Sequence, residues 1–166
     1  MGQSGFANTV AHFIDAVQAL ESAASGVGAP GPYVALLHPK QFADIQDSIL
    51  AQTTGILQFV QPSYEAISAK GSHYKGSFLG VDIYTSSHVT NDGVDHIGAF
   101  FAPGALGYAN GMPSALPGAV QTMDMGEVLI EMDREADKAL TRIVGHCYLG
   151  MSIIDDNRGV AFKGAI

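Results

Sequence analysis

The stretch Pro32-Tyr-Val-Ala-Leu-Leu-His-Pro-Lys-Gln-Phe-Ala-Asp-Ile45 joins two patterns within a few residues. Its first part, Tyr33–Leu37, is a short continuous apolar run, which indicates a buried strand. Pro39 follows, and proline is favoured as the first residue of a helix. Beyond it, Phe42, Ile45 and Ile49 recur at helical spacing. The stretch therefore predicts a strand that leads directly into a helix over about 40–52.

The residues before this stretch predict a first helix over about 8–24. Its apolar positions repeat at helical spacing: Val10, Phe13, Ile14, Val17 and Leu20. Asn8 is placed to cap the start of this helix, and Gly26 to end it. The alanines between the apolar positions indicate close packing against other elements or another copy of the chain. Residues 26–32 are expected to form a connecting loop.

After residue 52 the pattern changes to strands. Residues 53–76 are mixed, with a candidate short helix near Tyr64–Ala69. Phe78–Tyr84 and Val94–Phe101 alternate with a period of two, and Asn91-Asp92-Gly93 between them is a turn signal. These two runs are expected to form a β-hairpin or two strands of one sheet. Residues 103–118 are rich in glycine and proline and predict a loop.

The last part of the chain mixes strand and helix patterns. Ala119–Met132 predicts one long strand or two, and Ala136, Ala139, Leu140, Ile143 and Val144 form a helical stripe. Further elements are expected as a strand at Tyr148–Ile154, a turn at 156–159 and a final strand at Val160–Phe162. Because helices and strands mostly do not alternate, an α+β fold is favoured over a doubly wound sheet. Residues 1–166 are expected to form a single domain.

The composition excludes several classes of protein. The 166 residues carry 16 acidic and 8 basic side chains, and no Lys or Arg precedes Lys40. A basic patch for nucleic acid and a basic leader segment are therefore not expected. The apolar stretch Phe6–Leu20 is interrupted by polar residues and is too short to span a bilayer. Only 14% of the residues are charged, which indicates that neighbouring subunits cover part of the surface.

Two glycine-rich stretches are similar to nucleotide-binding motifs but lack their context. Gly26-Val-Gly28-Ala-Pro-Gly31 matches G-x-G-x-x-G, yet it follows a predicted helix and precedes a predicted strand. A dinucleotide site needs the reverse order. Gly71-Ser-His-Tyr-Lys-Gly76-Ser77 lacks the lysine that follows the second glycine of a phosphate loop. Both stretches are interpreted as connectors, and no cofactor-binding residue is assigned.

The histidines, at 12, 38, 73, 88, 96 and 146, include no pair at the spacing of a zinc site. His88 and His96 could approach across the 91–93 turn, although two facing histidines are more often incidental than metal ligands. His146 and Cys147 would point to opposite faces of a strand, so a small buried cysteine is expected. This single cysteine excludes an internal disulfide and favours a reducing compartment. Ser114 lies in a loop between prolines without an indicated base, so no catalytic residue is assigned.

Acidic residues gather near the end of the chain: Asp124, Glu127, Glu131, Asp133, Glu135 and Asp137. They could hold a cation or supply an acid and a base, but such runs are usually solvated. Arg134, Lys138 and Arg142 have spacings that would line one side of a helix, where they could pair with acids at 131 and 135. Between subunits, such pairs would set register and partner choice.

Three segments, in this order, carry a resemblance to a known family. The first is Pro32–Ile45, and the second is Gly80-Val-Asp-Ile-Tyr-Thr-Ser-Ser-His-Val89 followed by Gly98-Ala-Phe-Phe-Ala-Pro-Gly-Ala-Leu-Gly-Tyr108. The third runs from Glu131-Met-Asp-Arg-Glu-Ala-Asp137 through Tyr148-Leu-Gly-Met-Ser-Ile-Ile-Asp155 to Arg158-Gly-Val-Ala-Phe162. Together they resemble the C-terminal half of the major capsid proteins of tailed bacteriophages, which have the Hong Kong 97-like fold.

The resemblance implies an α+β subunit whose axial domain lies near the capsomer centre, with strands that return to a peripheral domain. It implies a structural, non-enzymatic subunit of a viral capsid shell that encloses double-stranded DNA. The expected location is the virion, and the host cytoplasm before assembly. The expected partners are copies of the same chain in pentamers, hexamers or a shell, without sequence-specific nucleic acid and without a membrane.

The family's N-terminal arm, extended loop and spine helix are expected to be absent from this chain. The resemblance carries over no catalytic, cofactor-binding or metal-binding residue. Two other functions stay open as alternatives. A bacterial nanocompartment shell protein would use the same fold, and composition does not separate it from a virus. A small α+β enzyme, or a ligand- or metal-binding domain, would use the region of His88 and His96 together with the acidic cluster.

Overall fold

The computed structural model describes residues 6–22, 28–51, 59–111, 121–124, 129–135 and 138–166. The chain divides into two compact units, which are described separately. Unit 1 comprises Met1–Ala105 and Asp155–Ile166, and unit 2 comprises Leu106–Ile154. Unit 2 is therefore an insertion in unit 1, and the chain crosses between them twice. The expectation that residues 1–166 form one capsid-like domain stays a prediction.

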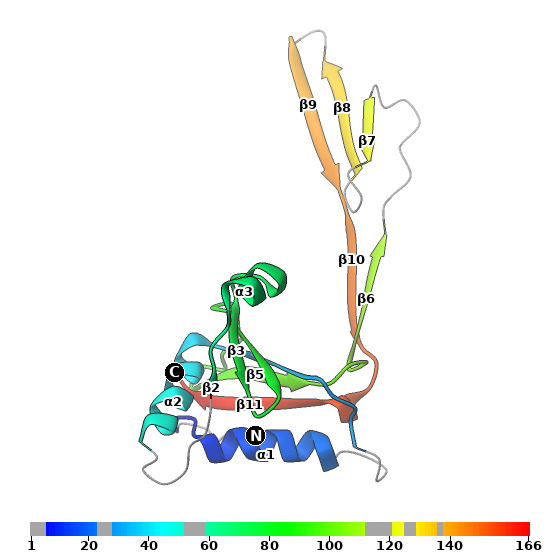
Figure 1. Ribbon diagram of the computed structural model, residues 1–166. Coiled ribbons are helices and arrows are strands. Elements are labelled where there is room, and N and C mark those ends of the chain that lie inside the picture. The colour runs from blue at the N-terminus through cyan, green and yellow to red at the C-terminus, as the bar shows by residue number, and fades with distance from the viewer. Residues whose placement is uncertain (1–5, 23–27, 52–58, 112–120, 125–128, 136–137) are drawn as a thin grey trace. The chain divides into compact units, whose positions relative to one another are not determined.

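Unit 1 is built on a six-stranded sheet in the order β11-β5-β1-β4-β3-β2 (Figure 1). Its strands are β1 (Tyr33–Leu37), β2 (Phe59–Val60), β3 (Tyr74–Phe78), β4 (Val81–Thr85), β5 (Asp95–Phe101) and β11 (Gly159–Ala165). Only β1 and β4 run parallel among these neighbours. The helices are α1 (Val10–Ser22), α2 (Pro39–Leu50), α3 (Tyr64–Lys70) and a short 3₁₀ helix, η1 (Asp156–Arg158). The unit is thus a mixed α+β structure, as predicted.

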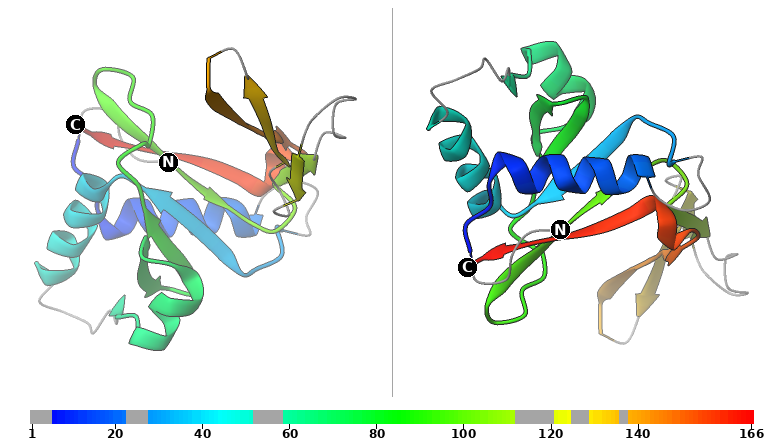
Figure 2. Two further views of the ribbon diagram at one scale, coloured as in Figure 1. Left: turned by 90° about the horizontal axis from the view of Figure 1, so that it is seen from above. Right: turned by 90° about the horizontal axis from the view of Figure 1, so that it is seen from below.

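Helix α1 packs across one face of this sheet (Figure 2). The side chains it buries, Val10, Phe13, Ala16 and Leu20, recur at helical spacing. The ring of Phe13 meets those of Phe78 and Phe100 edge-on, with centroids 5.1 and 4.9 Å apart. Phe100 in turn packs on Phe162 at 5.1 Å. Such aromatic pairs add about 0.5–1.5 kcal/mol each beyond their burial, so this cluster fixes α1 on β3, β5 and β11.

The predicted strand and helix at Pro32–Ile45 are confirmed by β1 and α2. His38 caps α2: its Nδ1 accepts a hydrogen bond from the backbone N–H of Lys40, at 3.2 Å. The side-chain Oε1 of Gln41 accepts one from the backbone N–H of His38, at 3.0 Å. This reciprocal arrangement is a capping box, which satisfies N–H groups that no helical carbonyl reaches.

Gln41 also joins α2 to the sheet. Its side chain is fully buried, and its Nε2 donates to the carbonyl oxygens of His96 at 2.9 Å and Phe162 at 3.0 Å. One amide therefore links α2 to both β5 and β11. Buried carbonyl oxygens without a partner are costly, at about 1–3 kcal/mol each, so the position of α2 is set by this amide as well as by its apolar side chains.

The cap of α1 differs from the prediction. Thr9, rather than Asn8, caps the helix, because Thr9 Oγ1 accepts from the backbone N–H of His12 at 3.4 Å. Asn8 is instead buried against β11, where a Cβ on Gly164 would lie 1.8 Å from Asn8 Nδ2. Only glycine leaves room for this close approach. The predicted stop at Gly26 lies outside the described residues.

The predicted strand at 78–84 is two strands. Leu79 and Gly80 form a two-residue turn with φ of 50° and 76°, and Phe78 pairs with Val81 across it. The predicted hairpin between Phe78–Tyr84 and Val94–Phe101 is wrong, since β1 lies between β4 and β5. The alternative, two strands of one sheet, is confirmed. A non-local strand can insert between two others without leaving a trace in their own alternation.

The described part of unit 2 forms two sheets. Strands β6 (Leu106–Gly111) and β10 (Tyr148–Ile153) form an antiparallel pair, and β7 (Gln121–Asp124), β8 (Leu129–Glu135) and β9 (Leu140–His146) form a second sheet. The predicted loop at 103–118 therefore contains a strand, although residues 112–118 lie outside the described ones. The predicted strand at 119–132 corresponds, where described, to β7 and β8.

The predicted helical stripe over 136–144 is wrong, because Leu140–His146 is strand β9. It pairs with β8 in a register that runs from Glu135↔Leu140 to Leu129↔His146. Ile143 and Val144 are β-branched and favour a strand, and cross-strand pairing outweighs the helical spacing. None of the described helices is long and apolar enough to cross a membrane.

We predict that Gln41→Ala destabilises unit 1 by about 3 kcal/mol, because the carbonyl oxygens of His96 and Phe162 lose their donor inside the protein. Gln46→Ala is the matched control: Gln46 lies on the same helix and is only half-buried, so its loss should cost under about 1 kcal/mol. Urea unfolding followed by circular dichroism measures both changes. Equal losses in the two variants would contradict the role of the Gln41 amide.

Candidate functional site

The structure places His88 and His96 in different surroundings. His96 is buried near the start of β5, whereas His88 is exposed after β4. Across the predicted turn, Asn91 rather than His88 forms an isolated bridge with His96. In the part of the chain that the structure describes, no group of three His, Cys, Asp or Glu side chains could hold a metal ion. The structure therefore does not assemble these two histidines into such a metal site.

His96 stacks instead on His38. The two rings are nearly parallel, at 13°, with centroids 3.5 Å apart. Nδ1 of His96 is buried and has no hydrogen-bond partner among the residues that the structure describes. Burial, and secondarily the neighbouring His96 ring, lower the pKa of His38 from its ordinary value of 6.5. The neutral form of His38 is also the one whose Nδ1 can accept the capping hydrogen bond from Lys40. This pair is a structural element of the α2 cap, sensitive to protonation.

The described members of the acidic cluster lie on strands of the second sheet of unit 2, Asp124 on β7 and Glu131, Asp133 and Glu135 on β8. Glu131 on β8 contacts His146 on β9, with 3.2 Å between Oε2 and Nε2, and Glu135 pairs with Lys138 at 2.9 Å. The expected alignment of Arg134, Lys138 and Arg142 along one helix face is wrong, because no helix forms there. Glu127 and Asp137 lie outside the described residues. For Asp124 and Asp133, the structure describes the backbone but not the side chain.

The remaining sequence candidates have structural roles or are not described. Gly71 ends α3 with φ of 91°. A Cβ added to Gly76 on β3 would lie 2.3 Å from the carbonyl oxygen of Val60. Gly28 lies between α1 and β1 as predicted for a connector, while Gly26 is not described. Cys147 is exposed between β9 and β10, so the expectation of a buried cysteine is wrong. Ser114 lies outside the described residues.

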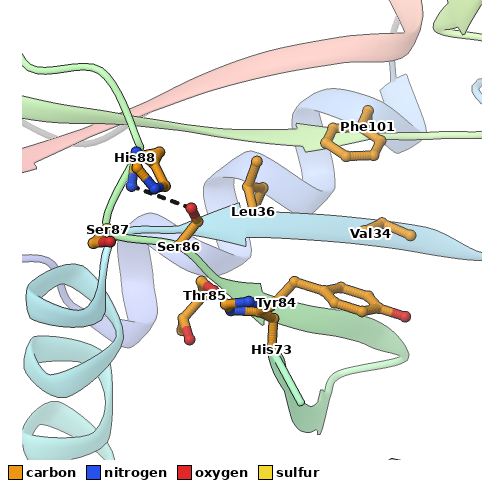
Figure 3. A pocket seen from close by; sticks show the side chains of 9 residues that line it. All are labelled: Val34, Leu36, His73, Tyr84, Thr85, Ser86, Ser87, His88 and Phe101. Atoms are coloured by element: carbon orange, nitrogen blue, oxygen red, sulfur yellow. Dashed lines mark hydrogen bonds between the residues drawn. The ribbon is translucent and has the colours of Figure 1, made fainter. Parts of the chain in front are cut away.

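An open groove of about 440 Å³ lies on the sheet of unit 1 (Figure 3). Val34 and Leu36 line it and alternate with the buried Ala35 and Leu37, so they belong to the face opposite α1. The lining combines apolar and neutral polar side chains: Val34, Leu36, His73, Tyr84, Thr85, Ser86, Ser87, His88 and Phe101.

Two polar side chains of the groove, those of Ser86 and His73, bond to the backbone. Ser86 Oγ accepts a hydrogen bond from the backbone N–H of His88, at 3.2 Å, and not from its ring (Figure 3). The ring of His73 is held through Nδ1 by the carbonyl oxygen of Thr85, at 3.0 Å. Nucleophilic catalysis requires a hydroxyl hydrogen-bonded to a basic side chain. The groove thus offers an apolar contact surface with hydroxyl and imidazole groups at its rim.

The pair of strands β6 and β10, called the ribbon below, has two different faces. The register pairs Leu106 with Ile153, Tyr108 with Met151 and Asn110 with Leu149, so these side chains share one face. Five of them form what we call the bulky face, and each is more than half exposed: Leu106 51%, Tyr108 55%, Leu149 62%, Met151 77% and Ile153 64%.

The opposite side of the ribbon, called the small face, carries mostly small residues, and at one end it also carries the exposed side chain of Tyr148: Gly107, Ala109, Gly111, Tyr148, Gly150 and Ser152. A shallow hollow of about 330 Å³ is lined by Gly107, Ala109, Gly150 and Ser152 together with Tyr108 and Met151. The sequence patterns predicted a loop at 103–118 rather than a paired strand, because the glycines at 107 and 111 indicated a loop. The signal that could have found it is the alternation of Leu106 and Tyr108 with small residues, opposite the apolar run Tyr148–Ile154.

Comparisons with known proteins give a structural match. No protein-family model matches the sequence, and no curated protein matches it. The chain is similar to a subunit in the cryo-EM structure of the holo-SrpI encapsulin complex from Synechococcus elongatus PCC 7942, with a TM-score of 0.61 and 15% identity. The alignment covers 93% of this chain and 49% of the encapsulin chain, so this chain spans about half the length of that subunit.

At this level of identity the likeness shows the fold alone. The chain has a mixed α+β, capsid-like fold, consistent at a coarse level with the Hong Kong 97-like fold expected from the sequence. The similar solved structure is an encapsulin complex, so the comparison does not point specifically to phage capsid proteins.

We predict that acid weakens the folded state partly through His38. A pKa below the ordinary value of 6.5 means that the folded protein binds this proton less readily than the unfolded chain. The free energy of unfolding is therefore highest above about pH 6.5 and falls as the pH drops below it. His38→Asn keeps a capping oxygen but cannot titrate. Urea midpoints at pH 7.5 and 5.5 should decrease less in His38→Asn than in the unmodified chain, and an equal decrease would contradict the prediction.

Proposed function

We propose that this chain is a structural subunit of a closed protein shell, which assembles through contacts between copies of itself. The observation that carries the proposal is the capsid-like fold, shared over 93% of the chain with a subunit of an encapsulin complex. The role is structural, and the proposal assigns it no enzymatic activity.

The surface of unit 2 supports this role. Single exposed apolar side chains are ordinary, but a contiguous set on one face usually marks an interaction site. The bulky face of the ribbon is such a set, and none of its five side chains is less than half exposed. A low proportion of charged residues, 14%, is also expected of a protein whose surface is covered by its neighbours.

Two kinds of shell fit the fold. A bacterial nanocompartment fits because the similar solved structure is an encapsulin complex. A viral capsid that encloses double-stranded DNA fits through the ordered resemblance of Pro32–Ile45 and the later segments to phage capsid proteins. A net charge of −8 suits the viral capsid, since negative charge on a shell repels the phosphates of the enclosed DNA. In the first case the shell would lie inside a bacterial cell, and in the second it would form the virion.

The first prediction from this proposal concerns assembly. Purified protein should elute from a sizing column as rings of five or six chains or as closed particles, because heterologous contacts between identical chains close into rings and shells. Light scattering gives the mass of each peak, and negative-stain images show its form. Monomers only, both for this chain and for it together with any sequence that adjoins it in its gene, would contradict the proposal.

The contents of particles isolated from the native source separate the two kinds of shell. Nuclease-protected double-stranded DNA inside them would assign the chain to a viral capsid. A co-purifying protein of one kind, without protected DNA, would assign it to a nanocompartment. Absorbance at 260 and 280 nm and mass spectrometry of the particle proteins give this distinction.

A further inference from the structure

The ribbon of unit 2 lacks the supports that normally stabilise an exposed pair of strands. A two-stranded antiparallel pair is only marginally stable in water unless another strand or a packed surface covers it. Within the described residues, β6 pairs only with β10, and the bulky face is exposed along the whole ribbon. The ribbon therefore needs a surface that covers it.

The ribbon also lacks the features by which edge strands avoid other chains. Exposed edges are usually protected by lysines, other charges, prolines or bulges. Leu106–Gly111 and Tyr148–Ile153 contain no charged residue and no proline, and their register continues without a shift from Leu106 to Gly111. Such strands are suited to contact with another chain.

The distribution of charge favours a second copy as the occupant. All charged residues of unit 2 lie between Asp124 and Arg142, and the ribbon has none. Two copies that each carry a net charge of −8 repel each other in general, but an uncharged ribbon can meet its counterpart without this repulsion. A nucleic acid or another charged partner would find no group on the ribbon to pair with.

The two faces of the ribbon are complementary to each other in shape. The bulky face projects Leu149, Met151 and Ile153. The middle of the small face is hollowed over Ala109 and Gly150, between Tyr148 at one end and Ile154, whose side chain lies against Gly107, at the other. We propose that the bulky face of one copy packs on the small face of the next copy. The contact is heterologous, so each copy still offers one free face, and repetition about an axis closes a ring. This inference rests on the proposed shell function and names the surface through which its copies meet.

Cysteine cross-linking tests the packing directly. Cys147 is exposed just before β10 and is first replaced by serine. One variant then carries Met151→Cys on the bulky face, and another carries Ser152→Cys on the small face and an affinity tag that changes its mass. The two variants are assembled separately and as a mixture, treated with a short thiol-specific cross-linker and separated on a denaturing gel.

The mixture should give a cross-linked heterodimer, while each variant alone should stay largely uncross-linked. Abundant homodimers of Met151→Cys alone would mean that bulky faces meet each other, and would overturn the proposal. Assembled particles without the heterodimer would also overturn it, while leaving the shell function intact. Failure of the unmodified chain to assemble would instead contradict the shell function itself, so the two failures are distinguishable.

A charge on the bulky face gives a second, independent test. Met151→Glu places a carboxylate in a contact that excludes water, so the assembled fraction should fall at least tenfold while the circular dichroism of the subunit is unchanged. Thr141→Glu, at an exposed position on β9 outside the ribbon, is the matched control and should assemble normally. Normal assembly of Met151→Glu would overturn the proposal.

Discussion

The buried amide of Gln41 is the interaction on which the arrangement of unit 1 depends. It reaches carbonyl oxygens on β5 and β11, which lie 55 and 121 residues further along the chain. Strand β1 pairs with β5 only through Val34, Ala35 and Leu36, and the amide bonds to β5 just beyond this pairing. Gly98 leaves the necessary space, because a Cβ there would lie 2.9 Å from Gln41 Oε1. A polar group that is fully satisfied in a low-dielectric interior tolerates little displacement, so this contact fixes the position of α2.

The two units differ in how many of their apolar side chains are buried within the unit itself. Unit 1 buries a continuous core in which aromatic rings from α1, β3, β5 and β11 contact one another, and its helix α2 is capped and bonded to the sheet. The ribbon of unit 2 has no comparable core, and its largest apolar side chains lie in solvent. In the proposed assembly, the core of unit 1 would keep the shape of that unit, and the ribbon would become stable when a neighbouring copy covers it.

Patterns within short stretches of sequence predicted two kinds of element. These are elements that contact residues close in sequence and elements that bury only one of their faces. The helical spacing of Val10, Phe13 and Leu20 and the sequence from Tyr33 through Pro39 were sufficient for α1, β1 and α2. Two of the errors, the hairpin between 78–84 and 94–101 and the loop at 103–118, come from non-local pairing. Leu106–Gly111 is a strand because Tyr148–Ile153 pairs with it, and no pattern within the glycine-rich segment shows that partner. The ribbon did leave one trace in the sequence: no Asp, Glu, Lys or Arg occurs between Asp95 and Asp124 or between Arg142 and Asp155.

The proposed packing also bears on how a capsid-like fold persists at 15% identity. Cores accept many exchanges of apolar residues if volume and pattern are kept. An interface between two different proteins is more constrained, because a change on one requires a matching change in another gene. Here both faces of the contact belong to a single ribbon, so a larger side chain at Met151 can be matched by a smaller one at Ala109 in the same chain. The interface can therefore change step by step while remaining complementary to itself, and two shells of one fold can come to use different residues at the same surface.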